Sequence, residues 1–177
     1  PQKLKFYNTR TPYTDWFYLT GTKVEQLFKM VFSYNVKKNW NLTANFNRTR
    51  SIGFYARETT NDNNVALSTN YRTTNNRYCL LGSLIYNGAK NMENGGLVND
   101  SSNSVDKQTI AVNLNDAQRS IINRSIYLKQ YLNFGRTKND SIKDKQITPT
   151  SSLALETFVE DNYLKYQDNN PLGGYYS

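Results

Sequence analysis

The sequence predicts an all-β protein: an antiparallel, up-and-down transmembrane β-barrel to which this chain contributes about seven strands. Apolar and polar residues alternate along short segments such as 28–35, where every even position is large and apolar, while Lys29, Ser33 and Asn35 occupy odd positions. The connections are tight at 37–39 and 74–76 and long at 51–63 and 88–123. No apolar run approaches the roughly 20 residues that a membrane helix requires. We therefore expect strands, with one short helix in the second long loop, which is expected to be extracellular.

We expect seven strands, each bounded by Gly, Asn, Asp, Thr or Ser, at residues 12–21, 24–36, 40–50, 64–73, 77–87, 124–134 and 153–166. If the first strand runs outward from the periplasm, both tight turns lie inside and both long loops lie outside. Bacterial outer-membrane barrels have this asymmetry. Two connections depart from it: the outer connection at 21–23 is short, and 135–152 would be a long periplasmic turn.

Two segments carry more specific expectations. Asn115 and Gln118 have the spacing of a helix N-cap and its partner, and they lead into Ile121, so we expect the short helix to begin there. The fifth strand is apolar on both faces. We expect a loop or plug to cover the side of this strand that faces the barrel interior.

Successive side chains of a strand point to opposite faces, so parity divides the residues into two sets. The polar set is expected to line a water-filled lumen, and its candidates are Lys29, Ser33, Asn45, Asn47, Ser68, Asn70, Arg72 and Lys129. The apolar set is expected to face lipid, and its candidates are Phe28, Met30, Phe32, Trp40, Leu42, Phe46, Leu67, Leu128 and Leu132. Arg48 and Arg50 lie on the apolar face near the outward end of their strand. We expect them to contact outer-leaflet lipid phosphates.

The composition argues against catalysis. The 177 residues include no His and a single Cys, so neither a Ser-His-Asp triad nor a Cys-His pair can form within this chain. Cys79 adjoins Leu80 and is read as a small buried apolar residue. Glu156 and Glu160 would lie about 13 Å apart on a strand, too far for the usual glycosidase pair. We expect no enzymatic activity, no metal site and no cofactor.

Several motifs are similar to those of a known family. The distinctive pieces are Pro12-Tyr13-Thr14-Asp15, Glu93-Asn94-Gly95-Gly96 and Tyr127-Leu128-Lys129-Gln130-Tyr131-Leu132-Asn133-Phe134-Gly135. Over roughly residues 8–168, their order and spacing resemble the amino-terminal half of the putative porin family of Bacteroidota. The resemblance implies an outer-membrane β-barrel several times longer than this chain. It implies no catalytic residues.

On this reading residues 1–177 are a single segment of a barrel domain. Seven strands leave two unpaired edges, which are costly in hydrocarbon, and we expect the remainder of the same polypeptide to pair with them. The other expected partners are outer-membrane lipid or lipopolysaccharide and other outer-membrane proteins. The expected location is the bacterial outer membrane.

Passive diffusion of small polar solutes is the leading predicted function. The chain has a net charge of +8. Lys29, Arg72 and Lys129 on the wet side predict a lumen that favours anions. Two alternatives remain: a plugged barrel acting as a scaffold subunit of a larger outer-membrane complex, and a soluble β-barrel that binds a small ligand. A nucleic-acid partner is not expected, because aromatic and most polar residues occupy opposite faces of the second and third strands.

Overall fold

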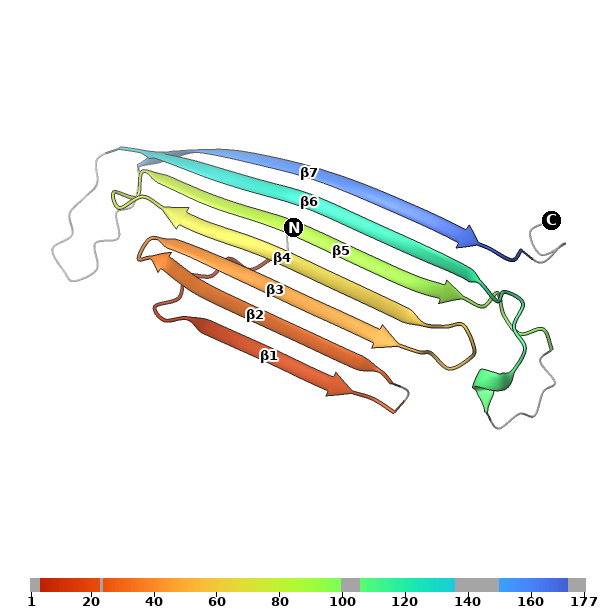
Figure 1. Cartoon of the computed structure of the whole chain (residues 1–177). Helices are drawn as coiled ribbons and strands as arrows, with labels where there is room; N and C mark the ends of the chain where they lie inside the picture. The colour runs from red at the N-terminus through yellow and green to blue at the C-terminus, as the bar shows by residue number, and fades with distance from the viewer. Residues whose placement is uncertain (1–3, 23, 100–105, 136–149, 172–177) are drawn as a thin grey trace.

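The seven strands form one antiparallel sheet in which sequence neighbours are spatial neighbours (Figure 1). The computed structural model describes residues 4–22, 24–99, 106–135 and 150–171. The strands are β1 (Tyr13–Thr20), β2 (Gln26–Lys37), β3 (Trp40–Ser51), β4 (Thr60–Arg72), β5 (Tyr78–Glu93), β6 (Ala117–Phe134) and β7 (Ser151–Asp168). The prediction of an all-β, up-and-down sheet is confirmed. Apart from β1, the strands have 12 to 18 residues, more than the 9–11 or so that a tilted membrane-spanning strand needs.

The central strands extend farther than the alternation of apolar and polar residues predicts. β4 begins at Thr60, β5 continues to Glu93, and β6 begins at Ala117. These extensions are mostly polar, apart from residues such as Met92, Ile121 and Ile122, and they pair with one another, as in the register partners Asn61 and Lys90. The long connections therefore shrink to residues 52–59 and 94–116.

The short helix lies elsewhere than predicted. A single 3-10 turn, η1 (Lys107–Thr109), is capped by Asp106, whose side chain accepts a hydrogen bond from the Gln108 backbone N–H at 3.0 Å. The prediction of a helix starting at Asn115 is wrong, because β6 starts two residues later and its backbone pairs with β5 from Ala117 onward. Cross-strand pairing has overridden a local capping signal. No helix among the described residues is long and apolar enough to cross a membrane.

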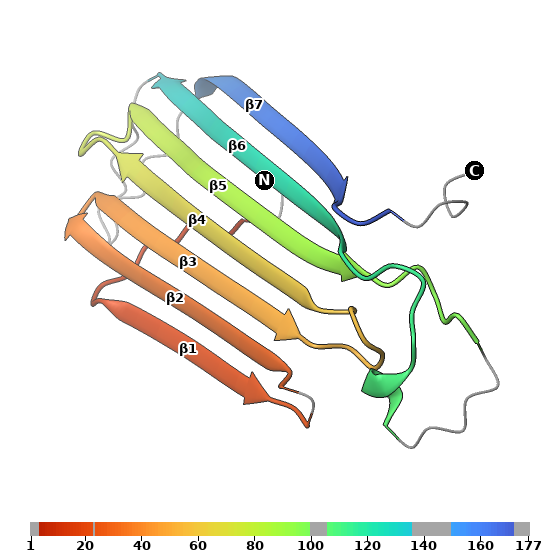
Figure 2. The same cartoon turned by 45° about the vertical axis from the view of Figure 1, so that its right-hand side comes forward.

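The connections divide between the two ends of the sheet as predicted. The turns after β2 and β4 share one end, and the longer loops after β3 and β5 share the other (Figure 2). Those two loops contact each other: Gln108 Nε2 donates to the Gly53 carbonyl at 3.1 Å, and Asn94 Nδ2 donates to Glu58 Oε1 at 3.2 Å. The expected long turn at 135–152 lies almost wholly outside the described residues.

On the inner strands, β2 to β6, burial on the two faces is the reverse of that in a soluble protein. We call the face bearing the predicted lumen residues the polar face and the opposite one the apolar face. Six polar residues are at most 5% exposed: Ser33, Asn41, Thr43, Ser68, Ser83 and Ser125. All six lie on the polar face. On the apolar face Leu67, Leu84 and Ile126 are 50%, 52% and 54% exposed. No described element covers the apolar face, and an uncovered apolar face of this size marks a surface that contacts either protein or membrane.

The sheet is open at both sides. Among the described residues β1 pairs only with β2, and β7 pairs only with β6. Each edge strand therefore presents a row of backbone N–H and C=O groups without a strand partner. In a membrane such edges must be paired, because hydrocarbon offers no hydrogen bonds.

Candidate functional site on the polar face

Strand pairing brings all eight predicted lumen residues to the polar face. Lys29 pairs with Asn47 in register, and Thr43 lies between Ser33 and Ser68. Arg72 and Lys129 lie on the same face of the sheet, with β5 between their strands. All nine predicted lipid-facing residues and both Arg48 and Arg50 lie on the apolar face, and none of them is buried. The division by parity therefore holds across the sheet, while contact with water or lipid stays a prediction.

A row of asparagines crosses the polar face. The register aligns Asn47, Asn64, Asn87, Asn123 and Asn162 on five successive strands, β3 to β7. Asn87 Nδ2 donates to Asn123 Oδ1 at 3.0 Å, and Asn123 Nδ2 donates to Asn162 Oδ1 at 2.6 Å. At the β3 and β4 positions, Asn47 and Asn64 form no side-chain hydrogen bond within the described residues. Sequence reasoning found only Asn47, because the row depends on the register.

Small hydroxyl residues form a second row. Ser33, Thr43, Ser68 and Ser83 are register neighbours on β2 to β5. Thr43 Oγ1 donates to Ser33 Oγ at 2.9 Å, and Asn41 Nδ2 donates to Ser33 Oγ at 3.0 Å. Ser33 is thus on the predicted face, but it is fully buried in this network rather than open to solvent.

Residues 4–10, which we call the amino-terminal segment, lie across the polar face (Figure 1). Its Phe6 and Tyr7 contact the rings at the two ends of the hydroxyl row, with ring centroids 6.4 Å from Tyr127 and 6.1 Å from Tyr13. The segment is also held by hydrogen bonds. Asn35 Nδ2 donates to Asn8 Oδ1 at 3.2 Å, and Asn70 Nδ2 donates to the Tyr7 carbonyl at 3.4 Å.

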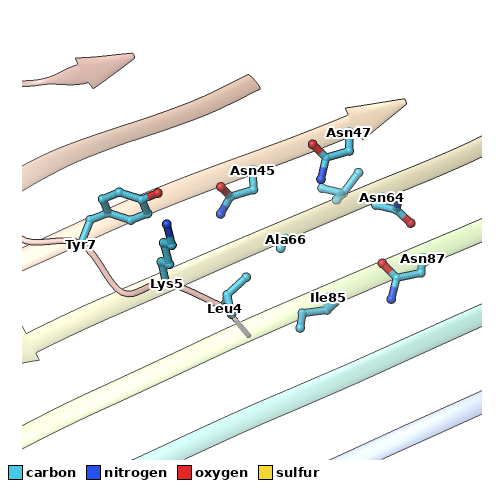
Figure 3. A pocket seen from close by; sticks show the side chains of 10 residues that line it. Leu4, Lys5, Tyr7, Asn45, Asn47, Asn64, Ala66, Ile85 and Asn87 are labelled. Atoms are coloured by element: carbon cyan, nitrogen blue, oxygen red, sulfur yellow. The ribbon is translucent and has the colours of Figure 1, made fainter. Parts of the chain in front are cut away.

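A pocket of about 510 Å³ lies between the amino-terminal segment and the sheet (Figure 3). Leu4, Lys5 and Tyr7 line one side of it. The sheet contributes Asn45, Asn47, Asn64, Ala66, Ile85 and Asn87. The pocket combines carboxamides with a small apolar floor. The segment also covers Ile85, which is an apolar residue on the polar face of the sheet. Ile85 belongs to β5, the strand with apolar residues on both sides.

Charge on the polar face is close to balanced. Lys129 Nζ lies 3.1 Å from Glu156 Oε2, directly opposite on β7, and Arg119 Nε lies 3.3 Å from Glu93 Oε1. The polar-face strand residues include four basic ones, Lys29, Arg72, Arg119 and Lys129, and six acidic ones, Asp15, Asp62, Glu93, Glu156, Glu160 and Asp168. Lys5 and Arg10 of the amino-terminal segment add two positive charges. Because Lys129 is paired with Glu156, it contributes little to the positive electrostatic field that the sequence predicts for the lumen.

The remaining candidates for chemistry are the thiol of Cys79 and the side chains that could ligate a metal. Cys79 is half-buried on the polar face opposite Arg72, rather than fully buried as predicted. Among the described residues no group of three or more Cys, Asp or Glu side chains is placed to hold a metal ion.

The family follows from a comparison with known proteins. A family model described as "Putative porin" matches residues 1–177, the whole chain. The chain belongs to this family. Membership indicates a porin-like role, and it agrees with the up-and-down antiparallel sheet. No curated protein and no solved structure gives a significant match to this member of the family.

Proposed function

We propose that this sheet is part of a closed outer-membrane barrel through which small polar solutes diffuse passively. The inverted burial of the inner strands carries the proposal: on β2 to β6, serines, threonine and asparagine are enclosed on one face while leucines and aromatics are exposed on the other. Such a sheet satisfies both faces only when the apolar face contacts acyl chains and the polar face encloses water. The strands that pair with β1 and β7 belong, in this proposal, to the same polypeptide.

The polar face favours uncharged solutes. Asn45, Asn47 and Asn64 line the pocket and form no side-chain hydrogen bond within the described residues, so their donors and acceptors are available to a hydroxylated or amide-bearing solute. The near balance of charge gives little reason for the anion preference that the sequence predicts. We therefore propose small neutral polar molecules as the main solutes.

Planar-bilayer recording of the full-length protein tests this proposal. In a salt gradient of potassium chloride we expect stepwise conductance with a reversal potential near zero, because acidic and basic residues on the polar face nearly cancel. Liposome swelling with neutral sugars of increasing size then gives the size limit. Strong selectivity for either ion would contradict the neutral-solute proposal, and absence of conductance would contradict diffusion itself.

A second candidate function is a plugged barrel that serves as a scaffold subunit. The observation favouring it is the amino-terminal segment, which covers the polar face from β1 to β6 through Tyr13 and Tyr127. If this segment and the strands that pair with β1 and β7 together close the lumen, the protein would insert into bilayers without conducting. The recording above separates the two candidates.

The ion pair between Lys129 and Glu156 gives a specific prediction for the channel. Glu156→Gln leaves the Lys129 ammonium without its partner, so we expect the reversal potential to shift toward anion selectivity. Lys129→Gln should shift it in the opposite direction, and the double substitution should restore the parent value. If the three variants share the parent's reversal potential, the pair does not face the conducting path.

A further inference from the structure

Five basic residues lie on the apolar face, in the half of each strand that is nearer the long loops. They come from four strands and are all exposed: Arg48, Arg50, Lys90, Arg124 and Lys165. The register places Arg50, Lys90 and Lys165 in one row across the sheet, with Asn61 and Ser120 between them. Arg48 and Arg124 lie two and four residues nearer the tight turns in register, and we call all five residues together the basic row. Sequence reasoning anticipated only Arg48 and Arg50.

The apolar band beneath the basic row ends at aromatic residues close to the strand ends opposite the long loops. These are Tyr34, Trp40, Tyr71, Tyr78 and Phe134, on β2 to β6. The aromatic edge of the band shifts along the strands from β3 to β6. Trp40 pairs with Tyr71, and Tyr71 pairs with Leu80, which is two residues short of Tyr78. Tyr78 in turn pairs with Leu132, which is two residues short of Phe134. Strands tilted against a flat membrane boundary produce this shift.

Two arginines lie the same number of residues away from this aromatic edge. Arg50 is ten residues from Trp40 along β3, and Arg124 is ten residues from Phe134 along β6. At about 3.3 Å per residue and a tilt of roughly 40°, ten residues rise about 25 Å, which is the height of the apolar band of an outer-membrane barrel. Arg50 and Arg124 therefore lie at the far boundary of the band.

The charges of the basic row are not neutralised within the described residues. The ion pairs there, at Arg119 and Lys129, are on the polar face. Asp161 is the acidic residue nearest in register, opposite Arg124, and it forms no ion pair with it. Arg48 and Arg50 are register partners of Asn63 and Asn61, which can add amide donors. Arg48 and Arg50 are about 7 Å apart along β3, and Lys90 lies two strands, about 10 Å, away.

We propose that the basic row binds the phosphate groups of outer-leaflet lipid A. The inference rests on the proposed function, because it needs the apolar face in a membrane with the long loops outside. Guanidinium groups bind phosphate oxygens in a bidentate manner, and several cations within reach neutralise more than one phosphate. The apolar band continues directly below the cations, so one amphiphile with acyl chains and phosphates complements both. A soluble anion would use only the cations, and we therefore assign the site to lipid.

Native mass spectrometry of the full-length protein tests the assignment, with diphosphoryl lipid A and its dephosphorylated form as probes. In Arg48→Gln/Arg50→Gln we expect lipid A to bind at least about tenfold more weakly, since each lost charge-assisted hydrogen bond is worth roughly a factor of ten. Arg124→Gln should weaken binding less. The matched control, Lys37→Gln/Lys38→Gln, removes two charges at the opposite end of the sheet and should leave the affinity unchanged.

Three outcomes would overturn the assignment: parent affinity in the double arginine variant, equal binding of dephosphorylated lipid A, or an equal loss in the lysine control. The conductance of the same preparations separates this failure from failure of the proposed function. A conducting barrel that binds both lipids equally refutes only the phosphate site. A protein that binds lipid A through the arginines but does not conduct refutes only diffusion.

Discussion

Leu67→Arg is expected to destabilise the barrel by about 2–4 kcal/mol, the range for a basic residue at the middle of the lipid-facing band. Leu67 is half exposed on the apolar face and is paired with Ala44 and Leu84. It lies four residues from Tyr71 at the band edge, near the middle of the hydrophobic layer. A guanidinium there has neither water nor a described acidic neighbour in register, so its charge is desolvated without compensation.

Asn47→Arg is the matched control, because Asn47 is on the neighbouring strand but on the polar face. A lumen-facing charge keeps its hydration, so we expect little change in stability and a shift in ion selectivity instead. Reversible unfolding of the full-length protein in lipid vesicles, followed by tryptophan fluorescence in guanidinium chloride, measures both variants. If Asn47→Arg is the more damaging and Leu67→Arg is tolerated, the apolar face is packed against protein, and the membrane assignment is wrong.

The alternation of residues predicted the faces of the sheet correctly because parity is a local property. Once Phe28 is placed on one side of β2, strand geometry places Met30 with it and Lys29 opposite, whatever the neighbouring strands do. The tight turns after β2 and β4 then bring successive strands together as antiparallel neighbours. The fold class was therefore accessible from one sequence.

Properties that depend on register were not accessible. Asn64 and Asn87 lie in one row only because β4 and β5 pair with a particular offset, and no local pattern reports that offset. The same limitation explains the strand ends. Residues 88–93 resemble a loop, yet their backbones pair with those of 117–122. Propensity alone favours a loop there, and pairing with β6 determines the outcome.

The amino-terminal segment escaped prediction for a different reason. Residues 4–10 have no strand or helix periodicity, and their position is set by side-chain contacts distant in sequence, such as Phe6 with Tyr127 and Asn8 with Asn35. The doubly apolar strand β5 was the only signal. It predicted a cover over its inner side but could not say which segment of the chain supplies it.

Replacing residues 4–10 with a Gly/Ser sequence of equal length is expected to raise the single-channel conductance several-fold. The replacement removes Phe6 and Tyr7, whose rings contact Tyr127 and Tyr13, and it removes the Asn8 side chain that accepts from Asn35. Freed of these contacts, the segment leaves the polar face and the open cross-section increases, and conductance follows the cross-section. The size limit for neutral sugars in liposome swelling should rise in parallel.

A short chemical cross-link provides the opposite control. In a Cys79→Ser background, Asn8→Cys and Asn35→Cys are joined by a short thiol-reactive cross-linker, because the native side chains meet at their amide tips, 3.2 Å apart, which leaves the two Cβ atoms too far apart for a direct disulfide. Because the segment already occupies this position, cross-linking should leave the parent conductance unchanged. A large fall on cross-linking would mean that the segment normally leaves the wall and acts as a gate. A parent protein that is silent until residues 4–10 are replaced would identify the segment as a plug, since only its removal opens the lumen.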